Sequence, residues 1–367
     1  MKQTGKTIVF RADASLQMGT GHVMRCLTLA DTLTASGAGC HFICRAHDGN
    51  LAAFIRQRGY QVHLLELVPG VPAQANPLAH AAWLGASMMQ DAAETAALLS
   101  HLKPDWLVVD HYALDARWET PQRRHVARLM VIDDLADRQH DCDLLLDQNL
   151  GRTDADYVAR VPAYCTCLLG PNYALLRPEF AALRPYSLQR RQKGALRTLL
   201  ITMGGVDKDN ATGHVLQALS GSSLPLDCRI TVVMGATAPW LNEVTTLAET
   251  LPWPVDVQVN VSNMAQLMAD ADLAIGAAGS TSWERCCLGL PSIVICLAEN
   301  QRFITNQLKQ CGAALVLEPP NNENFPHQLS IALNSLVTQQ VFLQDMSFSA
   351  RNISAGNGTS LIVKTII

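Results

Sequence analysis

Residues 10–30 read FRADASLQMGTGHVMRCLTLA, and they place a short apolar strand, a glycine loop and a helix in direct succession. The apolar residues that follow Gly21 recur at helical spacing, and residues 8–10 suit a strand. A strand that leads through glycines into a helix is typical of an anion site. The glycines let backbone N–H groups approach a phosphate, and the helix N-terminus adds partial positive charge. The stretch therefore predicts an α/β domain with an anion-binding turn at Gly19 and Gly21.

His22 stands in the first turn of this expected helix. The helix dipole disfavours a charged imidazole there, so we expect a neutral ring that can accept a proton. A neutral base beside a phosphate-binding turn suggests chemistry at a bond adjoining a phosphate. The alternative is that the two glycines only form a turn and that His22 only caps the helix. The pattern leaves both open, because Met24 stands where the full dinucleotide fingerprint has a third glycine.

Composition limits the class of protein. A chain of 367 residues predicts roughly two domains, and 49% hydrophobic residues with 16% charged residues can fill two cores. The net charge of −4 gives no basic footprint, so no nucleic-acid partner is expected. No apolar run reaches the ~20 residues of a membrane span, and the N-terminus does not read as a signal peptide. Eleven scattered cysteines without a C-x-x-C pair suit a reducing compartment. We expect a cytoplasmic monomer without stable membrane association.

Strands and helices alternate along both halves of the chain. This alternation predicts two Rossmann-like doubly wound α/β domains with parallel sheets, facing a cleft. We place the N-terminal domain at residues 1–187 and the C-terminal domain at residues 188–345, because residues 185–194 are polar and basic. Residues 346–367 are expected to pack back on the N-terminal domain. Ligands bind such sheets at the carboxyl ends of the strands, and several strands here end in acidic residues: Asp13, Asp110, Asp133 and Asp147.

The second domain contains two glycine turns at strand ends, and these suit a nucleotide diphosphate. Glu284, just inside the helix after the second turn, can accept hydrogen bonds from a ribose or complement the helix dipole. Residues 299–301, after another strand, are predicted to contact substrate, with a helix start as the alternative. The candidate nucleotide-binding and substrate-binding residues of this domain are Gly204, Gly205, Gly279, Ser280, Thr281, Glu284, Asn300 and Gln301.

Three further polar positions in the first domain leave alternatives open. Asp13 can orient His22, bind a sugar or cap its own loop. Tyr112, taken alone, suits packing at the domain edge with a solvated hydroxyl. Asp110 can act indirectly, by contacting a side chain that itself contacts the ligand. The neighbouring pair Asp133 and Asp134 can hold Mg²⁺, but no phosphate-loop lysine accompanies it. We expect neither a metal nor a cofactor.

The motifs FRADAS, GHVMRCLTLA, VVDHY, GPNYALLRPEF and GAAGSTSWERCCLGLPS follow one another along most of the chain. Together they resemble the UDP-sugar hydrolase family of pseudaminic acid biosynthesis, which supplies a sugar used on flagellin or surface polysaccharide. That family is similar in fold to GT-B glycosyltransferases, such as the enzyme that forms lipid II. Its members release UDP from UDP-2,4-diacetamido-2,4,6-trideoxy-β-L-altropyranose.

The resemblance implies roles for particular residues. His22 matches the histidine that activates water, Tyr112 matches a tyrosine at the sugar, and residues 276–284 match the segment that holds UDP. Trp283 stands where a distant member has asparagine, so no role is carried over to it. The implied reaction is attack of water at the anomeric carbon with inversion. The alternatives are a GT-B glycosyltransferase, a UDP-sugar 2-epimerase and a nucleotide-sugar-binding protein without turnover.

Overall fold

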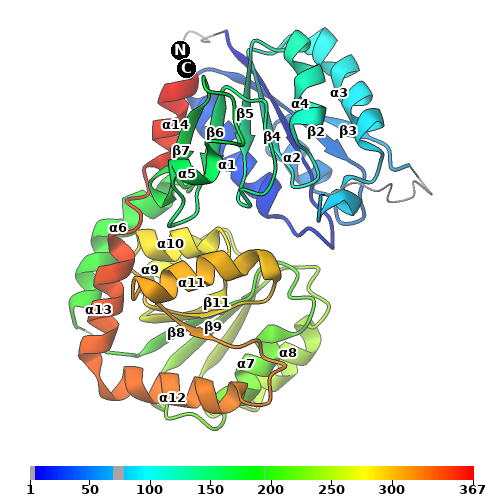
Figure 1. Ribbon diagram of the computed structural model, residues 1–367. Helices are drawn as coiled ribbons and strands as arrows, with labels where there is room; N and C mark the ends of the chain where they lie inside the picture. The colour runs from blue at the N-terminus through cyan, green and yellow to red at the C-terminus, as the bar shows by residue number, and fades with distance from the viewer. Residues whose placement is uncertain (1–4, 69–77, 194) are drawn as a thin grey trace. The chain divides into compact units, whose positions relative to one another are not determined.

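The computed structural model describes residues 5–68, 78–193 and 195–367, except for the side chains of residues 193 and 300 (Figure 1). A loop predicted at residues 69–77 lies outside the described part. The chain divides into two compact units. The N-terminal unit comprises Met1–Leu175 together with Gly358–Ile367, and the C-terminal unit comprises Leu176–Asn357.

The N-terminal unit contains a seven-stranded parallel sheet in the order β3-β2-β1-β4-β5-β6-β7. Its strands read as nearly continuous apolar runs, because a parallel sheet is buried on both faces. In β1, Ile8 and Phe10 pack on one face and Val9 on the other. The strands are β1 (Thr7–Ala12), β2 (Gly39–Arg45), β3 (Gln61–Leu65), β4 (Trp106–Asp110), β5 (Arg128–Ile132), β6 (Leu144–Asp147) and β7 (Thr166–Leu169).

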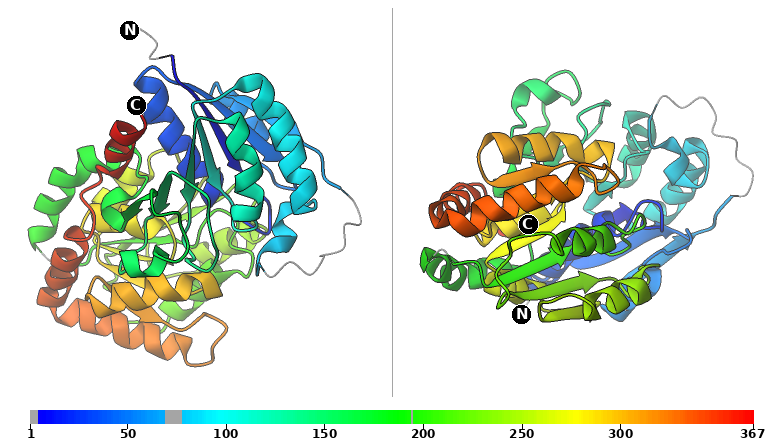
Figure 2. Two further views of the ribbon diagram at one scale, coloured as in Figure 1. Left: turned by 45° about the horizontal axis from the view of Figure 1, so that its top comes forward. Right: turned by 90° about the horizontal axis from the view of Figure 1, so that it is seen from below.

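Helices cover both faces of this sheet (Figure 1 and Figure 2). One core lies under the first, second and last α-helices, and the opposite core lies under α3 to α5. The α-helices are α1 (Gly21–Ala35), α2 (Ala52–Gln57), α3 (Met88–Leu102), α4 (Ala116–Gln122), α5 (Asp154–Tyr157) and α14 (Gly358–Ile366). Short 3₁₀ turns are η1 (Ala81–Leu84), η2 (Arg123–His125) and η3 (Pro171–Tyr173).

The C-terminal unit contains a six-stranded parallel sheet in the order β10-β9-β8-β11-β12-β13. The strands are β8 (Thr198–Thr202), β9 (Arg229–Met234), β10 (Val255–Val259), β11 (Leu273–Ala277), β12 (Ser292–Ile295) and β13 (Ala314–Leu317). The helices are α6 (Pro178–Arg190), η4 (Arg191–Lys193), α7 (Ala211–Leu219), α8 (Leu241–Glu249), α9 (Met264–Asp270), α10 (Thr281–Cys287), η5 (Glu299–Gln301), α11 (Arg302–Gln310), α12 (Phe325–Thr338) and α13 (Gln340–Arg351).

The division between the units differs from the boundary expected at residues 187 and 188. Helix α6 belongs to the C-terminal unit, because it packs on α9 and α10 and because Ser187 Oγ donates to the Leu288 carbonyl oxygen at 2.7 Å. The basic residues on which the expected boundary was based have a structural role instead. The guanidinium of Arg191 donates to the carbonyl oxygens of Met268 and Ala271 at the end of α9. Cations stabilise helix C-termini in this way.

The expected C-terminal segment, residues 346–367, also divides. Helix α13 stays with the C-terminal unit, and only α14 joins the N-terminal unit. Ile362 and Ile366 are buried in the core that contains α1, and Lys6 Nζ donates to the Ile366 carbonyl oxygen at 2.7 Å. Two ends of the chain that are far apart in sequence are thereby joined.

Both sheets reverse their winding between two central neighbours. In the N-terminal unit the chain moves outward from β1 to β3 and returns to β4 beside β1. In the C-terminal unit it moves outward from β8 to β10 and returns to β11 beside β8. Such switch points leave a crevice at the carboxyl ends of the strands, where open α/β sheets bind ligands. The glycine turns before α1 and α10 follow β1 and β11, so each turn lies at a switch point.

Candidate active site

His22 and Asp110 form the centre of the candidate site in the N-terminal unit. Gly19 has φ +75°, which glycine adopts without strain, and its N–H donates to the Ser15 carbonyl oxygen at 2.8 Å. This tight loop leads into α1, of which His22 is the second residue. His22 Nδ1 lies 2.6 Å from Asp110 Oδ1, and Asp110 is the last residue of β4. Because β1 and β4 are neighbours, the switch point brings the two side chains together.

Asp110 is held as a carboxylate. Burial by itself favours the neutral acid, but Arg25 opposes this effect and, together with His22, keeps the pKa of Asp110 well below its usual range. Arg25 donates from Nε to Oδ2 at 2.5 Å and from Nη2 to Oδ1 at 2.6 Å. An ionised Asp110 can only accept a hydrogen bond, so Nδ1 of His22 is the donor. In the neutral imidazole this leaves a free lone pair on Nε2.

Tyr112 lies against the imidazole. Its ring meets the His22 ring edge-on, with centroids 4.6 Å apart and planes at 87°. Its hydroxyl donates to Asp134 Oδ2 at 2.8 Å, and Arg25 Nη1 donates to the same oxygen at 2.6 Å. Trp83 stacks on Tyr112, with ring centroids 5.8 Å apart and planes at 24°. Burial raises the pKa of Tyr112 well above its usual value, so the hydroxyl stays protonated. The result is one connected group of polar and aromatic side chains around His22.

Asp13, the predicted alternative partner of His22, has other contacts. Its Oδ1 accepts hydrogen bonds from Arg11 Nη1 and from the backbone N–H of Arg45, both at 2.7 Å. Its Oδ2 lies 3.2 Å from His111 Nε2. Asp13 is fully buried and forms part of an internal ion network. The residue that orients His22 is therefore Asp110, and the prediction for Asp13 needs this correction.

Several residues around His22 did not stand out in the sequence. Arg25 follows His22 by three positions and thus shares its helix face, which is a usable signal. Asp134 was considered only as half of a metal pair. Trp83 and His80 gave no signal at all, although the His80 ring lies 5.3 Å from the Tyr112 ring. Aromatic contacts of this kind depend on tertiary structure.

The second glycine turn follows β11 in the C-terminal unit. Gly279 has φ +144°, a backbone conformation that glycine tolerates, and α10 starts at Thr281 after an exposed Ser280. The first N–H groups of a helix have no acceptor within it, so they point toward any ligand beyond the turn. Glu284 is half-buried in the first turn. Burial raises its pKa to about 7, although Arg177 and Arg285 oppose the effect.

The turn at Gly204 and Gly205 is different, because the helix after it is already capped. Asp207 accepts hydrogen bonds from the backbone N–H groups of Ala211 at 2.8 Å and Thr212 at 2.9 Å. The chain's own carboxylate thus occupies the N-terminus of α7. Any ligand contact at this turn falls to the glycines themselves, and Gly204 has φ +95° with open space beside it.

Residues 299–301 form the 3₁₀ turn η5 at the start of α11. Gln301 Oε1 accepts a hydrogen bond from the Leu297 backbone N–H at 3.0 Å, which is a local contact of the loop. This geometry matches the helix-start alternative for Gln301. The side chain of Asn300 lies outside the described part.

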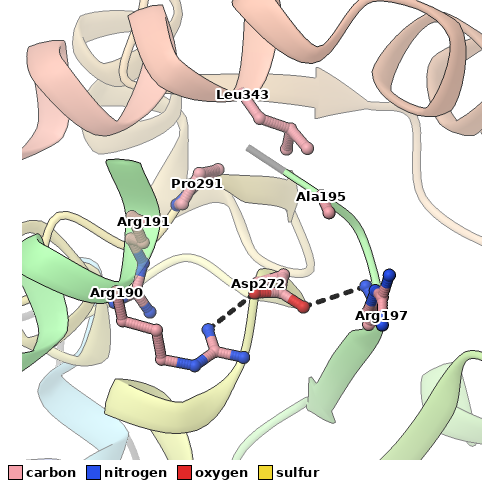
Figure 3. Close-up of a pocket in the computed structure, with 7 residues that line it drawn as sticks. All are labelled: Arg190, Arg191, Ala195, Arg197, Asp272, Pro291 and Leu343. Carbon is pink, nitrogen blue, oxygen red and sulfur yellow. Dashed lines mark hydrogen bonds and ion pairs between the residues drawn. The ribbon is translucent and has the colours of Figure 1, made fainter. Parts of the chain in front are cut away.

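A pocket of about 490 Å³ lies at the amino ends of strands in the C-terminal sheet, opposite the glycine turns (Figure 3). Residues that directly precede β8, β11 and β12 line it, among them Arg197, Asp272 and Pro291. Arg190 Nη1 donates to Asp272 Oδ1 at 2.6 Å, and Arg191 caps α9 as described above. Because Arg190 and Arg191 have structural partners, we assign no ligand to this pocket.

The described residues contain neither a cluster suited to a metal ion nor a helix suited to a membrane. No group of three or more His, Cys, Asp or Glu side chains among residues 5–68, 78–193 and 195–367 is arranged to hold a metal ion. No helix within the same ranges is both long and apolar enough to cross a membrane.

Comparisons with known proteins agree with this architecture. Residues 214–365 match the glycosyltransferase family 28 C-terminal domain. MurG of Acinetobacter baumannii superposes with a TM-score of 0.71 at 16% identity, over 98% of this chain and 99% of that chain. The chain has the GT-B fold. The predicted fold class, two Rossmann-like α/β domains with parallel sheets, is confirmed.

Sequence relatives point to sugar metabolism. The chain is 25% identical over 305 residues to the UDP-2,4-diacetamido-2,4,6-trideoxy-beta-L-altropyranose hydrolase of Campylobacter jejuni, covering 83% of this chain and 97% of that protein. It is 31% identical over 170 residues to the spore coat polysaccharide biosynthesis protein SpsG of Bacillus subtilis, covering 45% and 49%. An uncharacterized Methanocaldococcus jannaschii protein is 25% identical over 303 residues, and the chain spans 56% of its length. The chain is thus related to proteins of nucleotide-sugar and polysaccharide metabolism.

Proposed function

We propose that this protein hydrolyses UDP-2,4-diacetamido-2,4,6-trideoxy-β-L-altropyranose to UDP and the free sugar. The observation that carries the proposal is the pairing of His22 Nδ1 with Asp110 at 2.6 Å, at the switch point of the N-terminal sheet. A histidine oriented in this way presents a basic Nε2, as a general base requires. The 25% identity along 97% of the Campylobacter jejuni hydrolase supports the choice of substrate.

In the proposed reaction, Nε2 of His22 takes a proton from water while the water oxygen bonds to the anomeric carbon. The bond between this carbon and the UDP oxygen breaks, and its electron pair leaves with UDP. Attack on the face opposite the leaving group inverts the anomeric centre. Asp110 stabilises the imidazolium that forms, and His22 then returns its proton to solvent. The step uses no metal ion.

The two units have separate roles in this proposal. The C-terminal unit binds UDP, with backbone N–H groups at residues 279–281 on the diphosphate and Glu284 on the ribose. The match of residues 214–365 to a glycosyltransferase C-terminal domain supports this role. N–H groups fixed at a helix start stabilise the negative charge that develops on the leaving diphosphate. The N-terminal unit supplies His22, with Tyr112 beside the sugar.

An incubation without acceptor tests the proposal. We expect the pure protein to convert the UDP-diacetamido sugar steadily to UDP and free sugar, and NMR at early times to show the inverted anomer. Appearance of UDP only after an acceptor is added would instead support a glycosyltransferase. The match of residues 214–365 to the glycosyltransferase family 28 C-terminal domain is the observation that supports this second candidate.

A further inference from the structure

Arg285 is a buried cation without an acidic partner. The residue is 2% exposed, and among the described residues no carboxylate oxygen lies within 4.0 Å of its guanidinium nitrogens. Its Nη2 donates to the Ala277 carbonyl oxygen at 2.9 Å and to Ser282 Oγ at 3.0 Å, and both acceptors are neutral. Its Nη1 is buried and makes no hydrogen bond within the described part of the chain. The buried Arg11 and Arg25, by contrast, each pair with a carboxylate.

The guanidinium lies directly beneath the turn that leads into α10. A Cβ atom on Gly276 would lie 2.5 Å from Arg285 Nη1 and 2.8 Å from the Thr202 carbonyl oxygen. Gly276 belongs to β11 and Thr202 ends β8, so the charge sits at the switch point of the C-terminal sheet. Arg285 itself belongs to the last turn of α10, and its side chain runs back toward the helix N-terminus. Gly276 leaves the space that the guanidinium occupies.

Burying an unpaired charge is costly, which calls for a compensating group. Burial lowers the pKa of Arg285 to about 10, so the side chain remains charged at neutral pH. Glu284 does not supply a full negative charge there, because burial raises its own pKa to about 7. The described residues thus leave a positive charge under a turn whose N–H groups also favour an anion.

We propose that Arg285 selects for the diphosphate of the nucleotide that binds at this turn, acting as a buried positive charge beneath the backbone. The proposal rests on the proposed function, which places UDP at residues 279–281. Arg285 also fixes the Ala277 carbonyl and the Ser282 hydroxyl, so it shapes the turn as well as charging it. Its effect should therefore depend on the charge of the ligand and not on the nucleoside.

The test compares UDP with uridine, which differs in charge. Calorimetry measures both dissociation constants for the wild type, Arg285→Met, Arg285→Lys and the matched control Arg229→Met. Arg229 is an exposed arginine at the start of β9, at the opposite edge of the sheet. We expect Arg285→Met to weaken UDP binding by about tenfold or more while uridine binding changes less than about twofold. Arg285→Lys keeps most of the preference for UDP, and Arg229→Met keeps all of it.

Two results would overturn the proposal: equal losses of UDP and uridine affinity, which indicate a structural role only, or unchanged UDP affinity in Arg285→Met.

If that variant does not fold, the salt dependence of UDP and uridine binding to the wild type tests the proposal instead. Salt screens buried charges much less than exposed ones, so the ratio of UDP to uridine affinity should fall by less than about fivefold between 0.05 and 0.5 M NaCl. A larger fall assigns the preference to exposed cations. If the wild type does not bind UDP at all, the proposed function fails, and this inference with it. If the UDP-diacetamido sugar is hydrolysed and UDP binds, but Arg285 has no selective effect, only this inference fails.

Discussion

At the scale of single residues, the central feature is the pairing of His22 with an ionised Asp110. The helix start positions the imidazole, and the carboxylate decides which ring nitrogen carries the proton. Arg25 completes the arrangement, because it donates hydrogen bonds to both carboxylate oxygens of Asp110 and keeps this residue charged. Nε2 of such a histidine is therefore already oriented to accept a hydrogen bond, and then a proton, from a water molecule.

Replacing His22 should remove catalysis but spare binding. We predict that His22→Ala lowers kcat by about 10²–10⁴-fold, which is the usual contribution of a positioned base. The dissociation constant for UDP should not change, because the proposal assigns UDP to the other unit. His101→Ala, at an exposed position of α3, serves as the control. If kcat of His22→Ala stays within a few-fold of the wild type, His22 is structural and the base lies elsewhere.

Glu284 gives a prediction about pH. Burial raises its pKa to about 7, and ribose hydroxyls donate hydrogen bonds best to the ionised form. Uridine affinity should therefore increase by on the order of tenfold as the pH rises from about 6 to 8, when the carboxyl loses its proton. Uridine avoids the titration of phosphate groups. In Glu284→Gln the affinity should be lower and independent of pH over this range, and a wild-type profile that is flat would exclude Glu284 as the ribose ligand.

At the scale of secondary structure elements, individual strands could be predicted from the sequence better than the contacts between residues on different strands and helices. The strands that deliver Asp110, Asp133 and Asp147 were predictable, because strands buried on both faces read as short apolar runs. The partner of His22 was harder to predict. Asp13 is near it in sequence, whereas Asp110 becomes its neighbour only because β4 returns beside β1.

Two further differences concern short strands and the domain boundary. The short strands β7 and β13 were not predicted, although the equally short β6 was, because a run of three or four apolar residues does not by itself distinguish a strand from other buried segments. The domain boundary was expected at residues 187 and 188 because residues 185–194, which include Arg190 and Arg191, are polar and basic, whereas the units divide between Leu175 and Leu176. In the structure they bind the end of α9 and the start of β11.

Helix α14 provides an element-scale test. Ile362 is fully buried in the core of the N-terminal unit, although it lies near the end of the chain. We predict that Ile362→Ala lowers the free energy of unfolding of this unit by about 2–5 kcal/mol, measured by urea denaturation. The exposed Lys364→Ala on the same helix is the control and should have little effect. Equal stability of the two variants would show that α14 does not pack as described.

At the scale of the whole molecule, two sheets with the same winding each carry a glycine turn at the switch point. Both domains and their α/β class followed from the alternation of strands and helices in the sequence. The sequence also placed the expected UDP site in the second domain, but it did not show which of the two glycine turns there precedes an uncapped helix start. Asp207 fills the helix start after Gly204 and Gly205, whereas the turn at Gly279 has an uncompensated cation beneath it.

Stability should decline on the alkaline side because of His140. Burial alone lowers the pKa of His140, but Glu119, whose Oε1 lies 2.7 Å from Nδ1, and Asp133 together outweigh burial and raise the pKa to about 9. A raised pKa stabilises the fold fully below the ordinary value of 6.5, and this stabilisation is lost as the pH rises toward 9. The loss should amount to about 3 kcal/mol. Denaturant unfolding at about pH 6 and at about pH 9 measures this loss of unfolding free energy. His140→Gln should remove most of the difference in unfolding free energy between the two pH values. An equally steep decline in that variant would assign the effect to another group.

The most direct test of the proposed function follows the oxygen of water. The protein is incubated with the UDP-diacetamido sugar in H₂¹⁸O without any acceptor, and the released UDP is analysed by mass spectrometry. Attack of water at the anomeric carbon predicts that UDP accumulates without ¹⁸O and that His22→Ala releases it far more slowly. UDP that carries ¹⁸O, or no UDP until an acceptor is supplied, would contradict a hydrolase whose base is His22.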